Sequence, residues 1–194
     1  MRAANRKPSP GAQPGIEGVA ITMEPQDDTR ATPATPRPFR SPVQFFAFGL
    51  GSGLSPKAPG TAGTLAAIPL YLLVADIGLP VYTTLLGLAC LVGVYLCGAA
   101  SRELGVHDHG GIVWDEFVGF WITMWAVPLT WQTVLAGFLL FRLFDIAKPW
   151  PISALDKRVG GGFGIMVDDV IAGMFSCLLL HLGWRALSGE WPLG

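Results

Sequence analysis

Charged residues are scarce in this 194-residue chain. Asp, Glu, Lys and Arg make up 14% of it, whereas a soluble domain usually carries about 25%. Hydrophobic residues make up 51%, and the mean hydropathy is +0.48. Because this apolar content lies in long runs, we predict an all-α integral membrane protein. The net charge of −1 offers no electrostatic attraction to nucleic acid, so no nucleic-acid partner is expected.

Cysteine pairs and several well-known sequence signatures are also missing. The three cysteines lie in apolar runs, without a C-x-x-C pair or a Cys-x5-Arg loop. We therefore interpret them as small buried hydrophobic residues. The chain has no Asp-x-Asp-x-Thr/Val sequence of aspartyl-phosphate enzymes and no Pro-Ser-Gly-His sequence of histidine-phosphate enzymes. The glycine-rich segment 48–65 is not a Walker A loop, because no Gly-Lys-Ser/Thr closes it.

Residues 1–42 lack the continuous apolar stretch of a signal peptide. They hold eight prolines and scattered charge, so we predict a disordered tail that is not cleaved. Residues 43–187 are predicted to form one membrane-embedded domain, and residues 188–194 a short C-terminal tail.

Five apolar runs follow the tail. They cover residues 64–75, 80–100, 117–129, 131–144 and 170–184. Several are shorter than the roughly 20 residues of a lone spanning helix, so flanking polar residues should belong to the helix ends. We predict about five transmembrane helices. Four, with a re-entrant first segment that contains Pro69, is the alternative.

Lys and Arg mark one side of the predicted membrane domain. They occur in the tail, at Arg102 after the second run, and at Lys148, Lys157 and Arg158 after the fourth, whereas the other connections have none. The positive-inside rule then puts the N-terminus and these polar loops in the cytoplasm and the C-terminus outside. Polar motifs from distant parts of the chain can therefore meet in one active site at the cytoplasmic face.

Two pairs of acidic residues stand directly before apolar runs. Asp115 and Glu116 precede the third run, and Asp168 and Asp169 precede the fifth. A single acid would suffice to cap a helix, where a carboxylate accepts backbone N–H groups. Two doubled acids instead favour a cation site, and carboxylate oxygens suit Mg2+.

Arg142, Asp145 and Lys148 follow one another at three-residue spacing near the end of the fourth run. On a helix they lie roughly along one face, and Pro149 should end that helix at Lys148. One interpretation is a structural Arg–Asp pair within the membrane. The other makes Asp145 a metal ligand or base and assigns the two cations to a phosphate group.

Two glycine-rich segments, 48–65 and 158–169, could bring backbone N–H groups to anionic oxygens. The alternatives are a structural turn with Thr61 as helix N-cap in the first segment, and a flexible interfacial loop in the second. The candidate phosphate-binding residues of these segments are Gly60, Thr61, Gly63, Thr64, Gly161 and Gly162.

Histidines and tryptophans complete the set of candidates. His107 and His109 precede the first acidic pair, and either could act as a general acid for a leaving group. Solvated or capping histidines are an equal alternative. His181 lies deep in an apolar run and is interpreted as packing. The tryptophans near predicted helix ends are interpreted as interfacial anchors.

Four motifs occur in a fixed order along the chain. They are GLGSGLSPKAPGTAGTL, HDHGGIVWDEFVGFW, FRLFDIAKPWPI and GGFGIMVDDVIAG. With these motifs in register, residues 45–184 resemble the phosphatidylglycerophosphatase A family.

The resemblance implies a multi-pass, Mg2+-dependent lipid phosphatase of the bacterial inner membrane. Such an enzyme hydrolyses phosphatidylglycerophosphate to phosphatidylglycerol and inorganic phosphate, on the route to cardiolipin. Its expected partners are the lipid substrate and the bilayer, and a homo-oligomer is compatible with it. The acidic motifs of the family carry over to five residues, and its basic groups to two. These are Asp115, Glu116, Asp145, Asp168, Asp169, Arg142 and Lys148. The resemblance also implies Lys57 as a further phosphate-binding candidate.

A small ion transporter or channel with an acidic cation site is the alternative function. An ion path should place polar groups at several depths of the membrane. The acids of this chain are instead expected on one side, and the short opposite connections are nearly uncharged. This pattern favours the enzyme. A purely structural membrane subunit would not need doubled acids beside glycine-rich segments.

Overall fold

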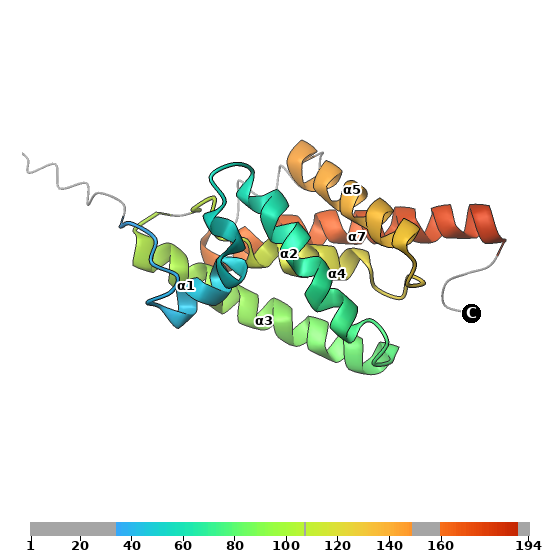
Figure 1. Cartoon of the computed structure of the whole chain (residues 1–194), viewed down its shortest axis with the longest axis horizontal. Coiled ribbons are helices and arrows are strands. Elements are labelled where there is room, and N and C mark those ends of the chain that lie inside the picture. Colours follow the sequence, from blue (N-terminus) through green and yellow to red (C-terminus); the bar gives the residue numbers. More distant parts are fainter. Residues whose placement is uncertain (1–33, 107, 149–159, 190–194) are drawn as a thin grey trace, which may run out of the picture. The chain divides into compact units, whose positions relative to one another are not determined.

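The computed structural model describes residues 34–106, 108–148 and 160–189, all of them in the unit formed by residues 31–194. Every regular element in these residues is a helix (Figure 1), and no strand occurs among them, so the predicted all-α fold is confirmed for this part of the chain. In chain order the elements are α1 (Pro42–Ala47), the 3-10 helix η1 (Gly49–Leu54), α2 (Pro59–Val74), α3 (Leu79–Leu104), α4 (Trp114–Thr123), α5 (Trp131–Ala147) and α7 (Gly161–Ser188).

Two helices, α3 with 26 residues and α7 with 28, are long and apolar enough to cross a membrane. At about 1.5 Å per residue each is longer than the roughly 30 Å hydrocarbon core of a bilayer. The other predicted runs fall in α2, α4 and α5, which have 16, 10 and 17 residues. Five spanning helices therefore remain a prediction.

Local sequence signals explain where several helices begin and end. Pro59 and Pro80 lie in the first turns of α2 and α3, where a missing N–H costs nothing. A capping box of Thr130 and Thr133 starts α5. Gly105 adopts a left-handed conformation after α3 and ends it.

The core forms around α4, which packs against α2, α3, α5 and α7. In Figure 1 its ribbon lies among these four helices. Phe117 and Phe120 of α4 are fully buried together with Tyr71 of α2 and Phe141 of α5. Because α4 is surrounded, any polar group on its first turn is held close to its neighbours.

Glycines allow the helices around α7 to approach one another closely. A Cβ atom on Gly162 would overlap the backbone of α3 at Val94 and Gly98. Similarly, a Cβ atom on Gly173 would overlap the carbonyl oxygen of Gly119 in α4. Small residues at crossings are typical of helix packing in membranes, where tight van der Waals contact replaces the hydrophobic effect.

The end of the segment predicted to be a disordered tail contacts α3. The backbone N–H of Ala34 donates to the carbonyl of Leu104 at 3.0 Å. Ser41 and Gln44 donate side-chain hydrogen bonds to Glu103 Oε2 at 3.0 and 2.9 Å. Residues 34–41 are therefore tied to the end of α3, while residues 1–33 and 190–194 lie outside the described residues.

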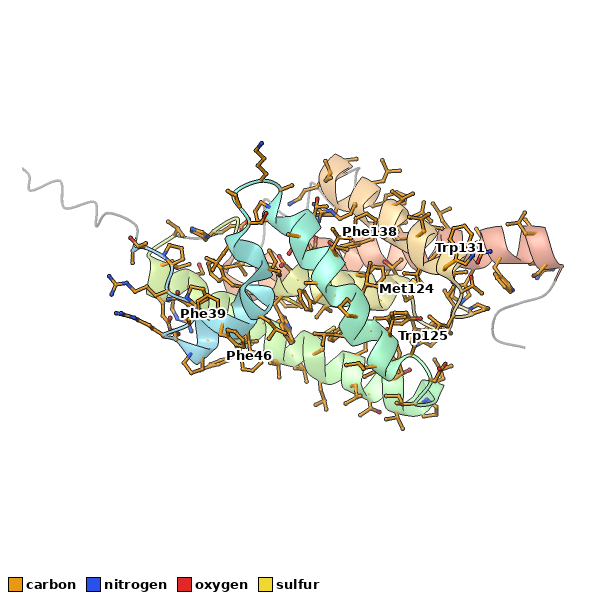
Figure 2. The ribbon with its side chains drawn as sticks, viewed as in Figure 1. Phe39, Phe46, Met124, Trp125, Trp131 and Phe138 are labelled. Carbon is orange, nitrogen blue, oxygen red and sulfur yellow. The ribbon has the colours of Figure 1, made fainter. Side chains whose placement is uncertain are left out.

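Trp114 and Trp121, interpreted from the sequence as interfacial anchors, also connect helices to one another. Their indole N–H groups donate to the carbonyls of Ala89 and Ala67, both at 3.1 Å, and so connect α4 to α3 and α2. Trp131 does lie on the surface with 72% of its area exposed. Figure 2 shows it at the opposite end of the helical unit from Phe39 and Phe46.

Candidate active site

Asp115 and Glu116 lie in the first turn of α4, as predicted, and precede its apolar run. The backbone N–H of Glu116 donates to Asp115 Oδ1 at 3.1 Å. Negative charge is favoured at this position, because the first turn of a helix carries unpaired N–H groups. The two carboxylates are only partly exposed, with 13% of the Glu116 side chain accessible.

Asp168 and Asp169 differ from their predicted position at the mouth of the last helix. Helix α7 already begins at Gly161, so both residues lie about two turns inside it. They are also buried, with 8% and 3% of their areas exposed. The prediction failed because glycine favours a loop locally, whereas the helix already includes Gly162, which packs closely on the backbone of α3.

Three of the predicted acids form one cluster. Asp115, Glu116 and Asp169 each offer a carboxylate oxygen within 4.8 Å of the others. Glu116 Oε2 and Asp169 Oδ2 are buried and have no hydrogen-bond partner among the described residues. Hard oxygen donors with unused acceptor capacity are the ligands that Mg2+ prefers, so the cluster fits a divalent cation.

The charges of this cluster are costly without a cation. The three carboxylates are largely shielded from water and lie close to one another, so they lose hydration and repel one another. Positive charge next to them offsets this cost.

Arg142 of α5 faces the cluster from the side. Its Nη1 lies 2.5 Å from Asp145 Oδ2 and 3.8 Å from Glu116 Oε1. It also donates to Thr64 Oγ1 of α2 at 3.5 Å. Its buried Nε has no partner among the residues that the structure describes. Arg142 therefore connects three elements and keeps one donor for a further group.

Lys148 and Asp168 form a second ion pair next to the cluster. Lys148 is the C-cap of α5 in a left-handed conformation, so the helix ends where Pro149 predicted. Its Nζ donates to Asp168 Oδ2 at 2.6 Å. The five predicted acids thus divide into three clustered carboxylates and two carboxylates paired with cations, Asp145 with Arg142 and Asp168 with Lys148.

The first glycine-rich segment reaches the site through Gly60 and Thr64. A Cβ atom on Gly60 would overlap Glu116 Oε1 and press on the Arg142 guanidinium. Thr64 Oγ1 donates to the Gly60 carbonyl at 3.0 Å. Thr61 lies in the first turn of α2 and is not its N-cap, because Ala58 occupies that position.

The other glycine candidates and Lys57 lie elsewhere. Gly63 packs on Val113, and Gly162 on the backbone of α3, so both have a helix-packing role. Gly161 starts α7 with a φ of 70°. Lys57 is exposed in the connection before α2.

Neither of the two histidines that the structure describes belongs to the acidic cluster. His107 lies outside the described residues. His109 Nδ1 accepts the Gly111 N–H at 3.0 Å, and its ring packs on Phe48. His181 is buried in α7 as predicted, and its Nδ1 lies 2.9 Å from the Cys177 carbonyl.

Comparisons with known proteins concern this same region. A family described as phosphatidylglycerophosphatase A matches residues 45–184. A protein of that name from Escherichia coli is 48% identical over 155 residues, 79% of this chain and 88% of that protein. Its counterpart from Haemophilus influenzae is 46% identical over 142 residues, 72% and 87% of the two chains. A Bacteroides thetaiotaomicron protein, provisionally named a phosphatidylinositol-3-phosphatase, is 40% identical over 167 residues, 81% and 99% of the two chains. No solved structure matches the chain.

Proposed function

Because the chain belongs to the phosphatidylglycerophosphatase A family, we propose that it hydrolyses the phosphomonoester of phosphatidylglycerophosphate. The products are phosphatidylglycerol and inorganic phosphate. The observation that carries this proposal is the cluster of three carboxylates beside Arg142. All of these residues lie inside the matched region.

The carboxylates of Asp115, Glu116 and Asp169 would hold one or two Mg2+ ions. When bound, the metal supplies positive charge to the phosphate and favours deprotonation of the attacking water. The unused oxygens of Glu116 and Asp169 support this assignment. Asp145 and Asp168, assigned to the metal from sequence, would instead orient the two cations with which they pair.

Arg142 and Lys148 would bind the phosphate oxygens. Charge develops on these oxygens during transfer, so fixed cations next to them stabilise the transition state. Arg142 is held by Asp145 and Thr64 before the substrate arrives. This pre-organisation avoids part of the cost of ordering a long side chain.

For the membrane arrangement we propose five helices in the bacterial inner membrane, with α3 and α7 crossing it fully. The N-terminus and the site would face the cytoplasm and the C-terminus the other side. The distribution of Lys and Arg supports this orientation. We retain residues 1–42 as a tail, 43–187 as the phosphatase domain and 188–194 as a C-terminal tail.

A test of the proposed function is phosphate release from phosphatidylglycerophosphate by the purified protein in detergent. We expect release with Mg2+ and its loss in excess EDTA. Recovery after Mg2+ is restored would separate metal removal from unfolding. Absence of phosphate release from a folded sample under both conditions would contradict the proposal. It would favour the alternative, an ion transporter or channel in which the acids form a cation site. That alternative is not favoured, because relatives of this chain carry the names of lipid phosphatases.

A further inference from the structure

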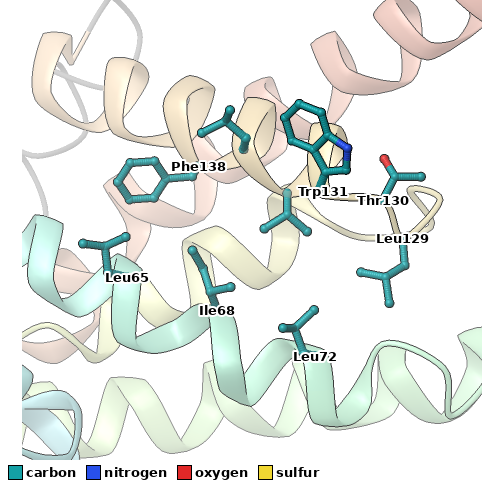
Figure 3. Close-up of a pocket in the computed structure, with 9 residues that line it drawn as sticks. Leu65, Ile68, Leu72, Leu129, Thr130, Trp131 and Phe138 are labelled. Atoms are coloured by element: carbon teal, nitrogen blue, oxygen red, sulfur yellow. The ribbon is translucent and has the colours of Figure 1, made fainter.

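An apolar groove of about 490 Å³ lies between α2 and α5 (Figure 3). Its lining includes Leu65, Ile68 and Leu72 of α2, and Trp131, Val134 and Phe138 of α5. Leu65 and Leu72 leave 52% and 48% of their areas exposed. In a bilayer this groove would be open to lipid.

On α2, the face that lines the groove continues into the candidate active site. Gly60, Thr64, Ile68 and Leu72 recur at four-residue spacing, so they form one continuous row that winds slowly around the helix. Gly60 and Thr64 lie against Arg142, whereas Ile68 and Leu72 line the groove. From Thr64 to Leu72 this face extends about 12 Å.

Helix α5 repeats this arrangement in the opposite direction. Val134, Phe138 and Arg142 also recur at four-residue spacing, and the first two line the groove. Figure 3 shows Phe138 beside Leu65 at one end of the groove, and Leu72 near Leu129 at the other. The end with Leu65 and Phe138 is therefore the end next to the site.

We infer that this groove binds an acyl chain of the lipid phosphomonoester while the phosphate contacts Arg142. The inference rests on the proposed function and adds a position for the apolar part of the substrate. A ligand that fits both regions must be anionic at one end and apolar over at least the length of the groove. Pockets that combine an apolar wall with a few convergent polar groups are typical of ligand sites.

A pair of neighbouring substitutions tests the groove. Leu72→Trp fills it from α2, whereas Leu73→Trp adds the same side chain at a position that is 75% exposed and does not line it. Both variants would be assayed with a long-chain and a dihexanoyl phosphatidylglycerophosphate in one detergent. We expect Leu72→Trp to lower kcat/KM for the long-chain substrate roughly fivefold to tenfold. The dihexanoyl substrate and the Leu73→Trp variant should be nearly unaffected.

The outcomes separate this inference from the proposed function. An equal loss of kcat/KM with both substrates in Leu72→Trp, or no difference between the two variants, would show that the groove does not bind an acyl chain. Phosphate release by the wild-type protein would still support the proposed activity. A second measurement does not depend on turnover. Phosphatidic acid with a photoreactive acyl chain should label residues 59–74 and 131–147 more strongly than a matched diacylglycerol. Equal labelling by the two probes would contradict acyl-chain binding in the groove, even if the enzyme is active.

Discussion

At the scale of single residues, the most informative side chain is Asp169. It is 3% exposed, has an unpartnered oxygen and lies beside two further carboxylates. A carboxylate at the centre of a membrane helix costs about 2.5–3.5 kcal/mol on insertion scales, and such residues usually mark functional sites. The Mg2+ proposed above, shared by the three acids, would offset this cost.

The first prediction is that Asp169→Asn abolishes turnover without unfolding the protein. Asn has nearly the same shape but lacks the negative charge, so it removes a cation ligand and leaves the packing intact. We expect kcat to fall at least about 100-fold, as for loss of a strong electrostatic contact in other enzymes. Phosphate release and thermal unfolding would be measured together. Asp76→Asn, at an exposed site in the α2–α3 connection, is the control. Full activity of a folded Asp169→Asn protein would contradict the role of Asp169 as a cation ligand.

A second prediction concerns Gly60. Gly60→Ala places a methyl group against Glu116 Oε1 and the Arg142 guanidinium, so it should displace both from their positions. We expect activity to drop roughly tenfold or more, because small displacements at a reacting centre have effects of this size. Gly87→Ala adds the same methyl group in open space on α3 and should be neutral. Equal activity of the two variants would show that Gly60 does not lie next to the reacting groups of the active site.

At the scale of helices, the glycine contacts of α7 determine how the acids are positioned. Gly162 packs against α3, and Gly173 against α4. The same helix carries Asp168 and Asp169 between these two contacts. A larger residue at either glycine should therefore destabilise the helix packing, and the positions of Asp168 and Asp169 would shift as a result.

The third prediction tests one of these contacts. Gly162→Ala should lower the free energy of unfolding by about 1–3 kcal/mol, the usual cost of overpacking, because its Cβ meets backbone atoms that cannot move aside. Gly183→Ala lies on the same helix in open space and should be neutral or slightly stabilising. The comparison is a thermal unfolding measurement in one detergent. A Gly162→Ala protein as stable as Gly183→Ala would contradict the packing role.

Helix positions also show which features could be predicted from sequence. The acids at the start of α4 and the end of α5 at Lys148 were predicted, because local signals control both. The start of α7 was not, since glycine favours a loop locally and the close packing of Gly162 on α3 is a tertiary contact that local sequence does not reveal. The Arg142–Asp145 pair was one of the two interpretations, because both residues lie on the same helix at three-residue spacing. The pairing of Lys148 with Asp168 could not be predicted, because spacing along one helix does not reveal which side chain of another helix lies opposite.

At the scale of the whole molecule, orientation in the membrane decides which membrane surface the site faces. Lys57 and Asp76 are exposed residues that lie before and after α2. With 16 residues, α2 rises about 24 Å between them. The two positions therefore report on opposite membrane surfaces if α2 lies across the bilayer.

The fourth prediction uses these positions. In a variant whose three native cysteines are replaced by Ala, Asp76→Cys should react with a membrane-impermeant maleimide in spheroplasts. Lys57→Cys should react only after the membrane is permeabilised. Labelling would be quantified by mass shift on a gel. The reverse pattern would place the site on the outer face, and labelling of both positions in intact spheroplasts would show that α2 does not lie across the membrane.

The contact between Gly119 and α7 has a consequence for ion choice. A Cβ atom on Gly119 would touch the backbone carbonyl of Asp169, and Gly119 is only one turn from Asp115 and Glu116. The spacing between the two helices that carry the three carboxylates is thus set by main-chain atoms in contact. If the proposed Mg2+ binds there, Ca2+, which needs oxygens at 2.3–2.6 Å and more of them than Mg2+, would fit less well, because the two helices cannot move closer to supply further ligands.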